Sequence, residues 1–465
     1  MLKALLNIFR IPDLRNRILF TIGMLAVYRI GFWIPLPGVD QSLLTEFMAT
    51  QTSEGGAAGR MAQYVSMFSG GSFGQSTIFG LGVMPYISAS IIFQLAGSVS
   101  QRLKQLQQEG PTGRQKIQEW TRYATVLLCI VQGIGWLSYL TKSNLVYPNW
   151  SANPLWWVTA VTAMTAGSVF LMWLGEQIDR FGIGNGVSLI ITAGILTGMP
   201  GAIQTVIGNF DPNDPSKLGW MGVLMLVAGF VVVVAGAIII TVAQRRIPIQ
   251  QAKHTRGRRV YGGARSYLPL RVNHGGVMPI IFASSLMIFP SMAFSFMADN
   301  AKAMAAPAWF EIGAGWLKQN FAMGMYPYVI LEVLLIFFFS YFWTTIVFNP
   351  EEMAKQLRDN GSFIPGIRPG PRTAQYLETV LERITYVGAA FLALIAVLPM
   401  MVQTALKVPY NVAAFLGGTG LLIVVSVGLD LIQRIEANLL MRNYAGFLGG
   451  NDEGKGPRIR GPRSM

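Results

Sequence analysis

The chain has 465 residues, of which 52% are hydrophobic and only 12% are charged, with a mean hydropathy of +0.44 and a formal net charge of +14. Too few polar residues are present to cover a soluble protein of this length, so the composition excludes a soluble domain and predicts a membrane protein. The single cysteine, Cys129, excludes a disulfide framework and is interpreted as core filler.

Apolar runs near the ~20 residues that a helix needs to cross a bilayer recur along the chain. They predict ten transmembrane helices, at 18–33, 78–97, 123–140, 155–174, 187–207, 220–242, 277–297, 326–348, 384–406 and 412–431. The first run has no small-residue cleavage site after it and is interpreted as a retained helix, not a signal peptide. An even number of crossings puts both termini on the same side of the membrane.

Lysine and arginine predict which side that is, because short cytoplasmic loops are enriched in them. With a cytoplasmic N-terminus, 29 of the 36 Lys and Arg fall in cytoplasmic segments and six fall in external ones, while Arg29 lies inside the first run. Both termini are therefore predicted to be cytoplasmic.

The pattern Gly-Val-Met-Pro-x-Ile-x-Ala-Ser occurs twice, at 82–90 and at 276–284. The turn-forming stretch 209–219 separates five predicted crossings from five, so the copies enter from opposite faces, as in inverted-repeat transporters. We expect an N-terminal half at 1–208, an external hinge loop at 209–219, a C-terminal half at 220–435 with cytoplasmic loops at 243–273 and 349–383, and a cytoplasmic tail at 436–465.

The repeat pairs Val83 with Val277 and Ile87 with Ile281, which would bring aliphatic side chains together near the middle of the membrane. An apolar neck of this kind excludes water and ions without a charged gate. For any one of these residues alone, ordinary core or lipid-facing packing is the better interpretation; the duplicated placement favours a constriction. The Gly-rich stretch 67–77 before the first copy is either a re-entrant element or a plain external loop.

Two other function classes deserve comparison with a channel. A secondary transporter for a small solute would share the inverted repeat, but it should place charged or polar coordinating groups at mid-membrane, where this chain has aliphatic ones. An enzyme would need a nucleophile, a metal cluster or an acid–base pair, and no such motif occurs. His254 and His274 lack the neighbouring ligands that a metal site requires. No cofactor or metal is implied.

Further motifs are specific to one known family. They are Phe68-Ser-Gly-Gly-Ser-Phe, Met172-Trp-Leu-Gly-Glu-Gln-Ile, Gly182-Ile-Gly-Asn-Gly, Gln244-Arg-Arg-Ile, Gly257-Arg-Arg-Val-Tyr, Pro279-Ile-Ile-Phe-Ala-Ser-Ser, Val347-Phe-Asn-Pro and Gly366-Ile-Arg-Pro-Gly. Along its whole length the chain resembles the SecY or Sec61 alpha family, the channel subunit of the bacterial protein-export translocon. The expected fold is an all-α integral membrane protein with two inverted five-helix halves and a re-entrant plug helix.

The resemblance implies a plugged hourglass pore that conducts unfolded preproteins and opens sideways through a lateral gate. It assigns the pore ring to Val83, Ile87, Val187, Ile191, Ile281 and Ile423. It assigns the plug to about 60–75, including Phe68, Ser69, Gly70, Gly71, Ser72 and Phe73. Asn185 matches a position that faces the plug, although a turn-forming Asn is the competing interpretation. Lateral-gate candidates are Ser88, Ile92, Ser285 and Phe289.

Partners follow from the same resemblance. The loop 243–273 has eight basic residues and no acidic one, which would attract phosphate backbones or acidic protein surfaces. Arg258, Arg259 and Arg368 are the candidate contacts for a SecA motor and for ribosomes. Small SecE-like and SecG-like membrane subunits, signal-bearing preproteins and membrane lipid are the other expected partners, in a bacterial inner membrane. Nothing in the chain binds nucleotide, so the energy source must lie outside it.

One residue departs from the expected pattern. Glu332 lies inside the eighth run, where an acidic side chain is functional by default because its unpaired burial is costly. Tyr326 and Tyr328 nearby suit a membrane boundary. We therefore expect Glu332 to reach the interface and remain solvated. The sixth run also lacks an acidic residue before Gln244-Arg-Arg, which leaves the contacts of that loop open.

Overall fold

A computed structural model describes residues 12–448 apart from 45, 48–75, 152, 212–217, 253, 257–258, 262–264, 304–306, 322–324, 407–411 and 413–418. The predicted plug residues and Arg258 lie outside the described residues. The first half contains α2 (Pro12–Ile30), η1 (Gly31–Trp33), α6 (Met84–Val99), α7 (Gln101–Gln108), α8 (Pro111–Lys142), α9 (Pro148–Ser151), α10 (Pro154–Phe181) and α11 (Gly186–Gly208).

The second half is built in the same way from long apolar helices. It contains α12 (Trp220–Val242), α13 (Met278–Ala303), α14 (Ala308–Asn320), α15 (Tyr326–Val347), α16 (Pro350–Asp359), α17 (Pro371–Leu406) and α19 (Thr419–Leu448). Each of the ten predicted spans contains a helix. Among the described residues, six helices are long and apolar enough to cross a membrane, and α6 and α13 contain shorter apolar stretches. The protein is a multi-pass membrane protein.

The prediction of an all-α fold is wrong at one end of the bundle. Strands β1 (Gln244–Gln251), β4 (Arg265–Arg271) and β5 (Ser362–Phe363) form an antiparallel sheet in the order β4-β1-β5, and β2 (His254–Arg256) pairs with β3 (Arg259–Tyr261). Ile247 and Ile249 are buried and alternate with more exposed neighbours along β1, and Ile247 belongs to a small core at this sheet. We call this end of the molecule the strand end.

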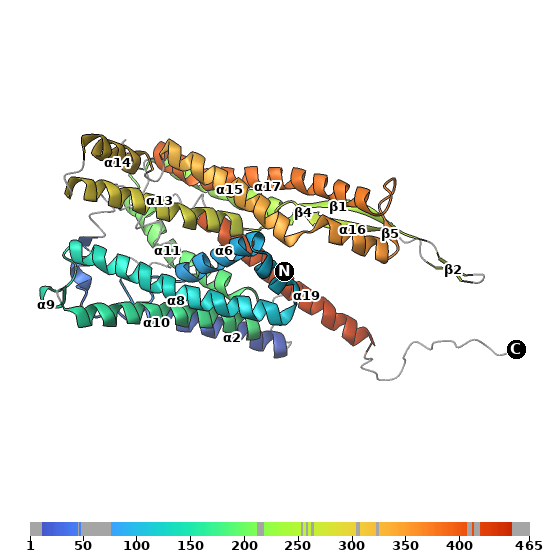
Figure 1. The fold of residues 1–465 in the computed structure, drawn as a ribbon, viewed down its shortest axis with the longest axis horizontal. Helices are drawn as coiled ribbons and strands as arrows, with labels where there is room; N and C mark the ends of the chain where they lie inside the picture. The colour runs from blue at the N-terminus through green and yellow to red at the C-terminus, as the bar shows by residue number, and fades with distance from the viewer. Residues whose placement is uncertain are drawn as a thin grey trace.

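The helices lie roughly along one direction in two groups (Figure 1). Helices α8 and α10 pack together with α2 in one group, and α13, α15 and α17 pack together in the other. The two groups meet where α6 contacts α13 and where α11 contacts α19. The largest hydrophobic cluster combines residues of all four of these helices, so the principal core lies between the halves.

The two copies of the repeated motif adopt the same local structure. Gly82 and Gly276 both have φ of +58°, a left-handed conformation that favours glycine. In each copy a Met-Pro pair then begins a helix, α6 at Met84 and α13 at Met278, because proline suits the first turn of a helix. The repeat therefore sets equivalent starting points for the two helices that join the halves.

The structure corrects the expectation for Glu332. Its side chain is buried, with 2% exposure, on the part of α15 that lies close to Ser284 of α13. Its Oε2 atom has no hydrogen-bond partner among the described residues. A sequence shows the depth of a residue along a helix but not which face of the helix meets a neighbour, and here α13 covers the face that bears the acid.

Burial makes position 332 sensitive to charge. We expect Glu332→Gln, which keeps the shape without an ionisable group, to leave the melting temperature of the purified protein almost unchanged. Glu332→Lys should destabilise it by about 3 kcal/mol, the typical cost of a charge at the centre of a membrane helix. Glu311→Lys on an exposed part of α14 is the control. Equal losses with Gln and Lys would show instead that the carboxylate has a charged partner.

His274 occupies the turn between β4 and α13 at the strand end. Its ring centroid lies 4.2 Å from that of Phe348, edge to face, and neither ring nitrogen has a hydrogen-bond partner among the described residues. Burial, together with the positive charge of Arg271, lowers the pKa of His274 to about 4. The Asn273 side chain donates to the Gly276 carbonyl at 2.8 Å and fixes the same turn.

A lowered histidine pKa makes folding stability depend on pH. Between about pH 6.5 and 4 the unfolded chain binds a proton at His274 that the folded protein does not, so stability is lost as pH falls through this window. We expect His274→Phe, which keeps the aromatic contact with Phe348, to reduce the fall in melting temperature between these pH values. His254→Phe is the control, and equal pH slopes for the wild type and His274→Phe would contradict the assignment.

Candidate functional site

The six aliphatic candidates for a pore ring lie in one hydrophobic cluster. Ile423 is 0% exposed, and Ile281, Val83, Ile191 and Ile87 are between 2% and 6% exposed. Val187 is partly buried and packs against the same cluster. Val83 directly precedes α6, and the other five residues lie in α6, α11, α13 and α19, so both halves of the chain contribute. The structure thus gathers the sequence candidates into one shared core.

Helices α6 and α13 present their ring candidates in equivalent ways. The Ile87 amide donates to the Val83 carbonyl, and the Ile281 amide donates to the Val277 carbonyl, both at 3.1 Å. Each pair of residues is therefore one helical turn apart on one face. Val277 is buried in the same cluster, but it is missing from the candidate ring. The repeat itself, which pairs Val277 with Val83, was the signal that could have included it.

The start of α11 is fixed by two side-chain caps. Asn185 Oδ1 accepts the Ser188 amide at 3.0 Å, and Asp179 accepts the Gly186 amide at 2.7 Å. Val187 follows directly, and its Cγ2 would lie 3.2 Å from a Cβ added at Gly175, so a glycine there lets α11 approach α10. The described contact of Asn185 is thus a helix cap, and its predicted position facing a plug stays a prediction.

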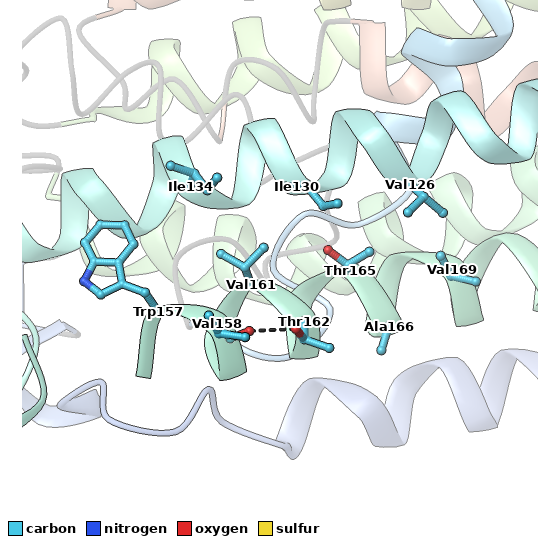
Figure 2. Close-up of a pocket in the computed structure, with 10 residues that line it drawn as sticks. All are labelled: Val126, Ile130, Ile134, Trp157, Val158, Val161, Thr162, Thr165, Ala166 and Val169. Atoms are coloured by element: carbon cyan, nitrogen blue, oxygen red, sulfur yellow. Dashed lines mark hydrogen bonds between the residues drawn. The ribbon is translucent and has the colours of Figure 1, made fainter. Parts of the chain in front are cut away.

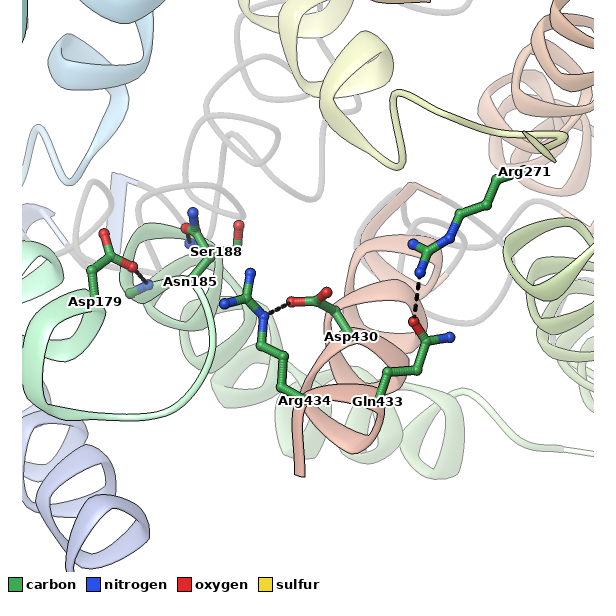
Figure 3. A network of polar contacts seen from close by, with 8 residues as sticks. Asp179, Asn185, Ser188, Arg271, Asp430, Gln433 and Arg434 are labelled. Atoms are coloured by element: carbon green, nitrogen blue, oxygen red, sulfur yellow. Dashed lines mark hydrogen bonds and ion pairs between the residues drawn. The ribbon is translucent and has the colours of Figure 1, made fainter. Parts of the chain in front are cut away.

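Helix α19 supplies Ile423 and continues to the strand end. Positions 423, 427, 430 and 434 are spaced by three or four residues and share one face of this helix. The face changes from buried Ile423 and Val427 to Asp430 and Arg434, which form an ion pair at 2.8 Å. It therefore runs from the apolar cluster to a polar region between the halves (Figure 3).

Hydrocarbon side chains fill the described part of the region between the halves. Among the described residues, Glu332 is the one acidic or basic side chain that is buried, and it belongs to α15, outside the six ring candidates. Aliphatic contacts are non-directional, so such a neck can part without breaking hydrogen bonds and reseal without a charged gate. This chemistry suits a barrier to water and ions. The six ring candidates themselves have no group that could coordinate a small solute.

The lateral-gate candidates lie on the two helices where the halves meet. Ser88 of α6 and Ser285 of α13 are buried, while Ile92 is 53% exposed. Phe289 lies in α13, and its side chain is outside the described part of the structure. Contact between α6 and α13 agrees with the predicted proximity of the second and seventh spans.

Basic side chains are exposed around the sheet at the strand end. Arg245, Arg246, Arg265 and Arg271 are exposed on β1 and β4. Arg368 is exposed in the turn before α17, and its carbonyl accepts the Thr373 hydroxyl at 3.0 Å. Arg259 lies in β3, but its side chain and all of Arg258 are outside the described residues.

The residues that follow the predicted plug are firmly held. Ser76 and Thr77 are buried, the Leu36 amide donates to the Ser76 carbonyl at 3.0 Å, and Thr77 forms a β-bridge with Pro35. The segment just after position 75 is thus anchored to the end of η1, next to the start of α6.

A separate apolar groove lies between α8 and α10 (Figure 2). Its lining includes Val126, Ile130 and Ile134 from α8 and Val161 and Val169 from α10. None of these residues belongs to the cluster that contains the ring candidates. The groove is consistent with an outer, lipid-facing surface of the first half and is distinct from the candidate pore.

Comparisons with known proteins agree on one family. The SecY family model matches residues 77–432. The chain is 40% identical to the protein translocase subunit SecY of Chlamydia muridarum over 474 residues, covering 98% of this chain and all of that protein. It is 41% identical to the SecY subunit of Thermotoga maritima over 467 residues, covering both chains completely.

Solved structures share the fold at low sequence identity. A protein-conducting channel superposes with a TM-score of 0.58 at 17% identity, covering 93% of this chain and 94% of that one. A SecY channel whose plug domain is described as stabilising the closed state has a TM-score of 0.56 at 18% identity, with the same coverage. Sec61 in a canine ribosome–channel complex also has a TM-score of 0.56, at 16% identity and again with the same coverage. The small-solute transporter alternative finds no support.

Full-length similarity and the shared fold lead to the same conclusion. The chain belongs to the SecY family, the pore-forming subunits of the protein translocase.

Proposed function

We propose that Val83, Ile87, Val187, Ile191, Ile281 and Ile423 form the constriction through which unfolded preproteins pass. The observation that carries this proposal is their convergence from four helices into one buried cluster between the halves. An aliphatic ring can fit itself around side chains of any sequence because it makes no specific hydrogen bonds. The same ring excludes water when no polypeptide is present.

The two halves, 1–208 and 220–435, would move about the loop 209–219. At the two ends of this loop, which the structure describes, Phe210 forms a β-bridge with Leu218. The ring of Phe210 also meets that of Trp220 edge to face, with 4.9 Å between the ring centroids. These contacts hold the ends of α11 and α12 together. Parting of the halves would therefore be largest away from this loop, at the contact of α6 with α13.

Opening between α6 and α13 would give a signal helix access to lipid. Ser88 and Ser285 are small and buried in this region, and Ile92 is already exposed. A Leu-rich helix gains free energy on leaving the channel for the bilayer, whereas a charged segment loses it. These two helices thus support the lateral-gate proposal.

The plug is proposed for residues 60–75, which lie outside the described part of the structure. Support comes from the anchored residues Ser76 and Thr77, which would fix the end of a plug next to the start of α6. The similar SecY channel with a plug domain gives independent support.

The strand end is proposed to face the cytoplasm, in agreement with the distribution of Lys and Arg. Its exposed arginines would bind acidic protein surfaces or ribosomal RNA, which corresponds to a SecA motor and to ribosomes. The canine Sec61 relative is found in a ribosome–channel complex. SecE-like and SecG-like subunits would complete the translocase in a bacterial inner membrane. The chain would act as a conduit without catalysis of its own.

Site-specific photo-crosslinking tests the ring directly. We expect a photoreactive residue at Ile191 to crosslink to a secretory precursor stalled during export, because the chain must pass within contact distance of the ring. The same residue at Val232 of α12, which is 67% exposed, is the lipid-facing control. Engagement of the precursor without a crosslink at Ile191 would rule out this ring position.

Substitution of Arg368 tests the proposed binding surface for SecA and ribosomes. We expect Arg368→Gln to weaken binding of SecA and of ribosomes by about two- to tenfold, the scale of one interfacial charge, with a smaller effect at high salt. Lys318→Gln on α14 is the matched control, since it removes a positive charge from a loop that is predicted to be external. Unchanged binding of both partners by the Arg368 variant would exclude the contact.

A further inference from the structure

A short amphipathic helix, α14, lies at the end of the bundle opposite to the strand end (Figure 1). It packs along α13 and also contacts α15. The rings of Phe294 on α13 and Phe321 at the end of α14 meet with 5.0 Å between their centroids. None of the ten predicted spans includes α14, and the function proposed above gives it no role.

Helical spacing divides α14 into three faces. Phe310, Ala314 and Leu317 share the face toward the bundle, where Ala314 is buried and the other two are partly buried. Glu311 and Lys318 lie seven residues apart, two helical turns, and share a second face. The two charges of the helix are therefore collected on one side of it.

The third face is apolar and exposed. Trp309, Ile312 and Trp316 are spaced by three and four residues, and they are 75%, 72% and 57% exposed. An exposed apolar patch of this kind indicates an interaction surface. Tryptophan is enriched at the boundary between membrane and water, where the ring contacts lipid and the N–H group contacts water. Two tryptophans on one short face therefore favour lipid as the partner.

The neighbouring helix continues this surface into the membrane. On α15, Tyr326, Ile330, Leu334 and Phe338 are spaced by four residues and are between 41% and 79% exposed. The stripe extends over about 18 Å of a spanning helix, so lipid is its expected environment. Tyr326 begins α15 only six residues after α14 ends. The level at which the lipid-facing stripe ends is thus the level at which α14 lies.

The last turn of α14 satisfies its carbonyl groups within the protein. The Asn320 side chain donates to the Trp316 carbonyl at 2.9 Å, and the Phe321 amide donates to the Leu317 carbonyl at 2.8 Å. Backbone groups next to lipid must find partners inside the protein, because hydrocarbon offers none. These hydrogen bonds suit a helix end that lies against the bilayer.

We propose that α14 is a membrane-boundary helix, and that Trp309, Ile312 and Trp316 insert among the headgroups and upper acyl chains of the leaflet remote from the strand end. The charged face then meets water, and the buried face keeps the helix on α13. Because α13 also contacts α6, α14 would hold the outer end of a proposed gate helix at a constant depth. The lipid contact is independent of the proposed ring; only the name of the leaflet, external, rests on the proposed orientation.

Spin labelling of the complete translocase in lipid bilayers tests this proposal. The one native cysteine, Cys129, is buried, so a nitroxide can be attached selectively at Ile312→Cys. We expect oxygen to reach this nitroxide and a water-soluble nickel complex to be largely excluded, at a depth of about 5–10 Å into the boundary between headgroups and acyl chains.

Glu311→Cys is the matched control, because it lies one residue away on the charged face. Its nitroxide should show the opposite accessibilities. Equal access of the nickel complex to both positions would overturn the proposal. Exclusion of both reagents at position 312 would also overturn it, since protein would then cover this face.

Photo-crosslinking in cell membranes is a second test that needs no purified variant. A photoreactive aromatic residue at Trp316 should form an adduct with phospholipid, detected by the mass of the modified peptide, whereas the same residue at Glu311 should not. A protein adduct at position 316, or no lipid adduct there, would contradict the proposal.

The orientation is tested separately with a membrane-impermeant maleimide. Applied from outside the cell, it should label Glu311→Cys. Labelling only from the cytoplasmic side would overturn the proposed orientation and name the other leaflet, while a lipid adduct at position 316 would still support the membrane-boundary helix.

Discussion

The structure depends on the fact that hydrocarbon offers no hydrogen bonds to a polypeptide backbone. Each spanning segment must satisfy its own amides and carbonyls, and a helix does so. As a result, side chains alone hold the two halves together where α6 meets α13 and α11 meets α19. No shared backbone ladder has to break when these helices separate. A channel that opens both through the membrane and sideways into the lipid needs interfaces of this kind.

Apolar and charged side chains contribute differently in the region where the halves meet. Ile423 and Ile281 are fully or almost fully buried and contribute through contact area. Arg434 and Asp430 are about half exposed, so their ion pair contributes little free energy of folding. The apolar side chains therefore account for the packing between the halves, while the Asp430–Arg434 pair stays within α19.

The repeat predicts only part of the proposed ring, namely Val83, Ile87 and Ile281, while Val187, Ile191 and Ile423 were assigned from the family resemblance alone. Gly82 and Gly276 share the same unusual backbone conformation, so the sequence pattern and the geometry are equivalent in the two copies. The sheet was missed although the alternation of Ile247 and Ile249 is present in the sequence, since the surrounding arginines and glutamines were interpreted only as a charged loop. Glu332 was misplaced because burial depends on which face α13 covers. The Arg122–Glu176 ion pair joins residues 54 positions apart, which no local pattern reveals.

The sheet at the strand end has a mechanical consequence. Strand β1 follows α12, β4 leads through the His274 turn into α13, and β5 lies between α16 and α17, yet all three share one hydrogen-bonded sheet. One of these strands belongs to the loop between α15 and α17, and the other two belong to the loop between α12 and α13. A force on either loop would thus act on several helices of the second half. Because β4 leads into α13, which contacts α6 of the first half, a displacement of either loop would be passed through the sheet to this helix.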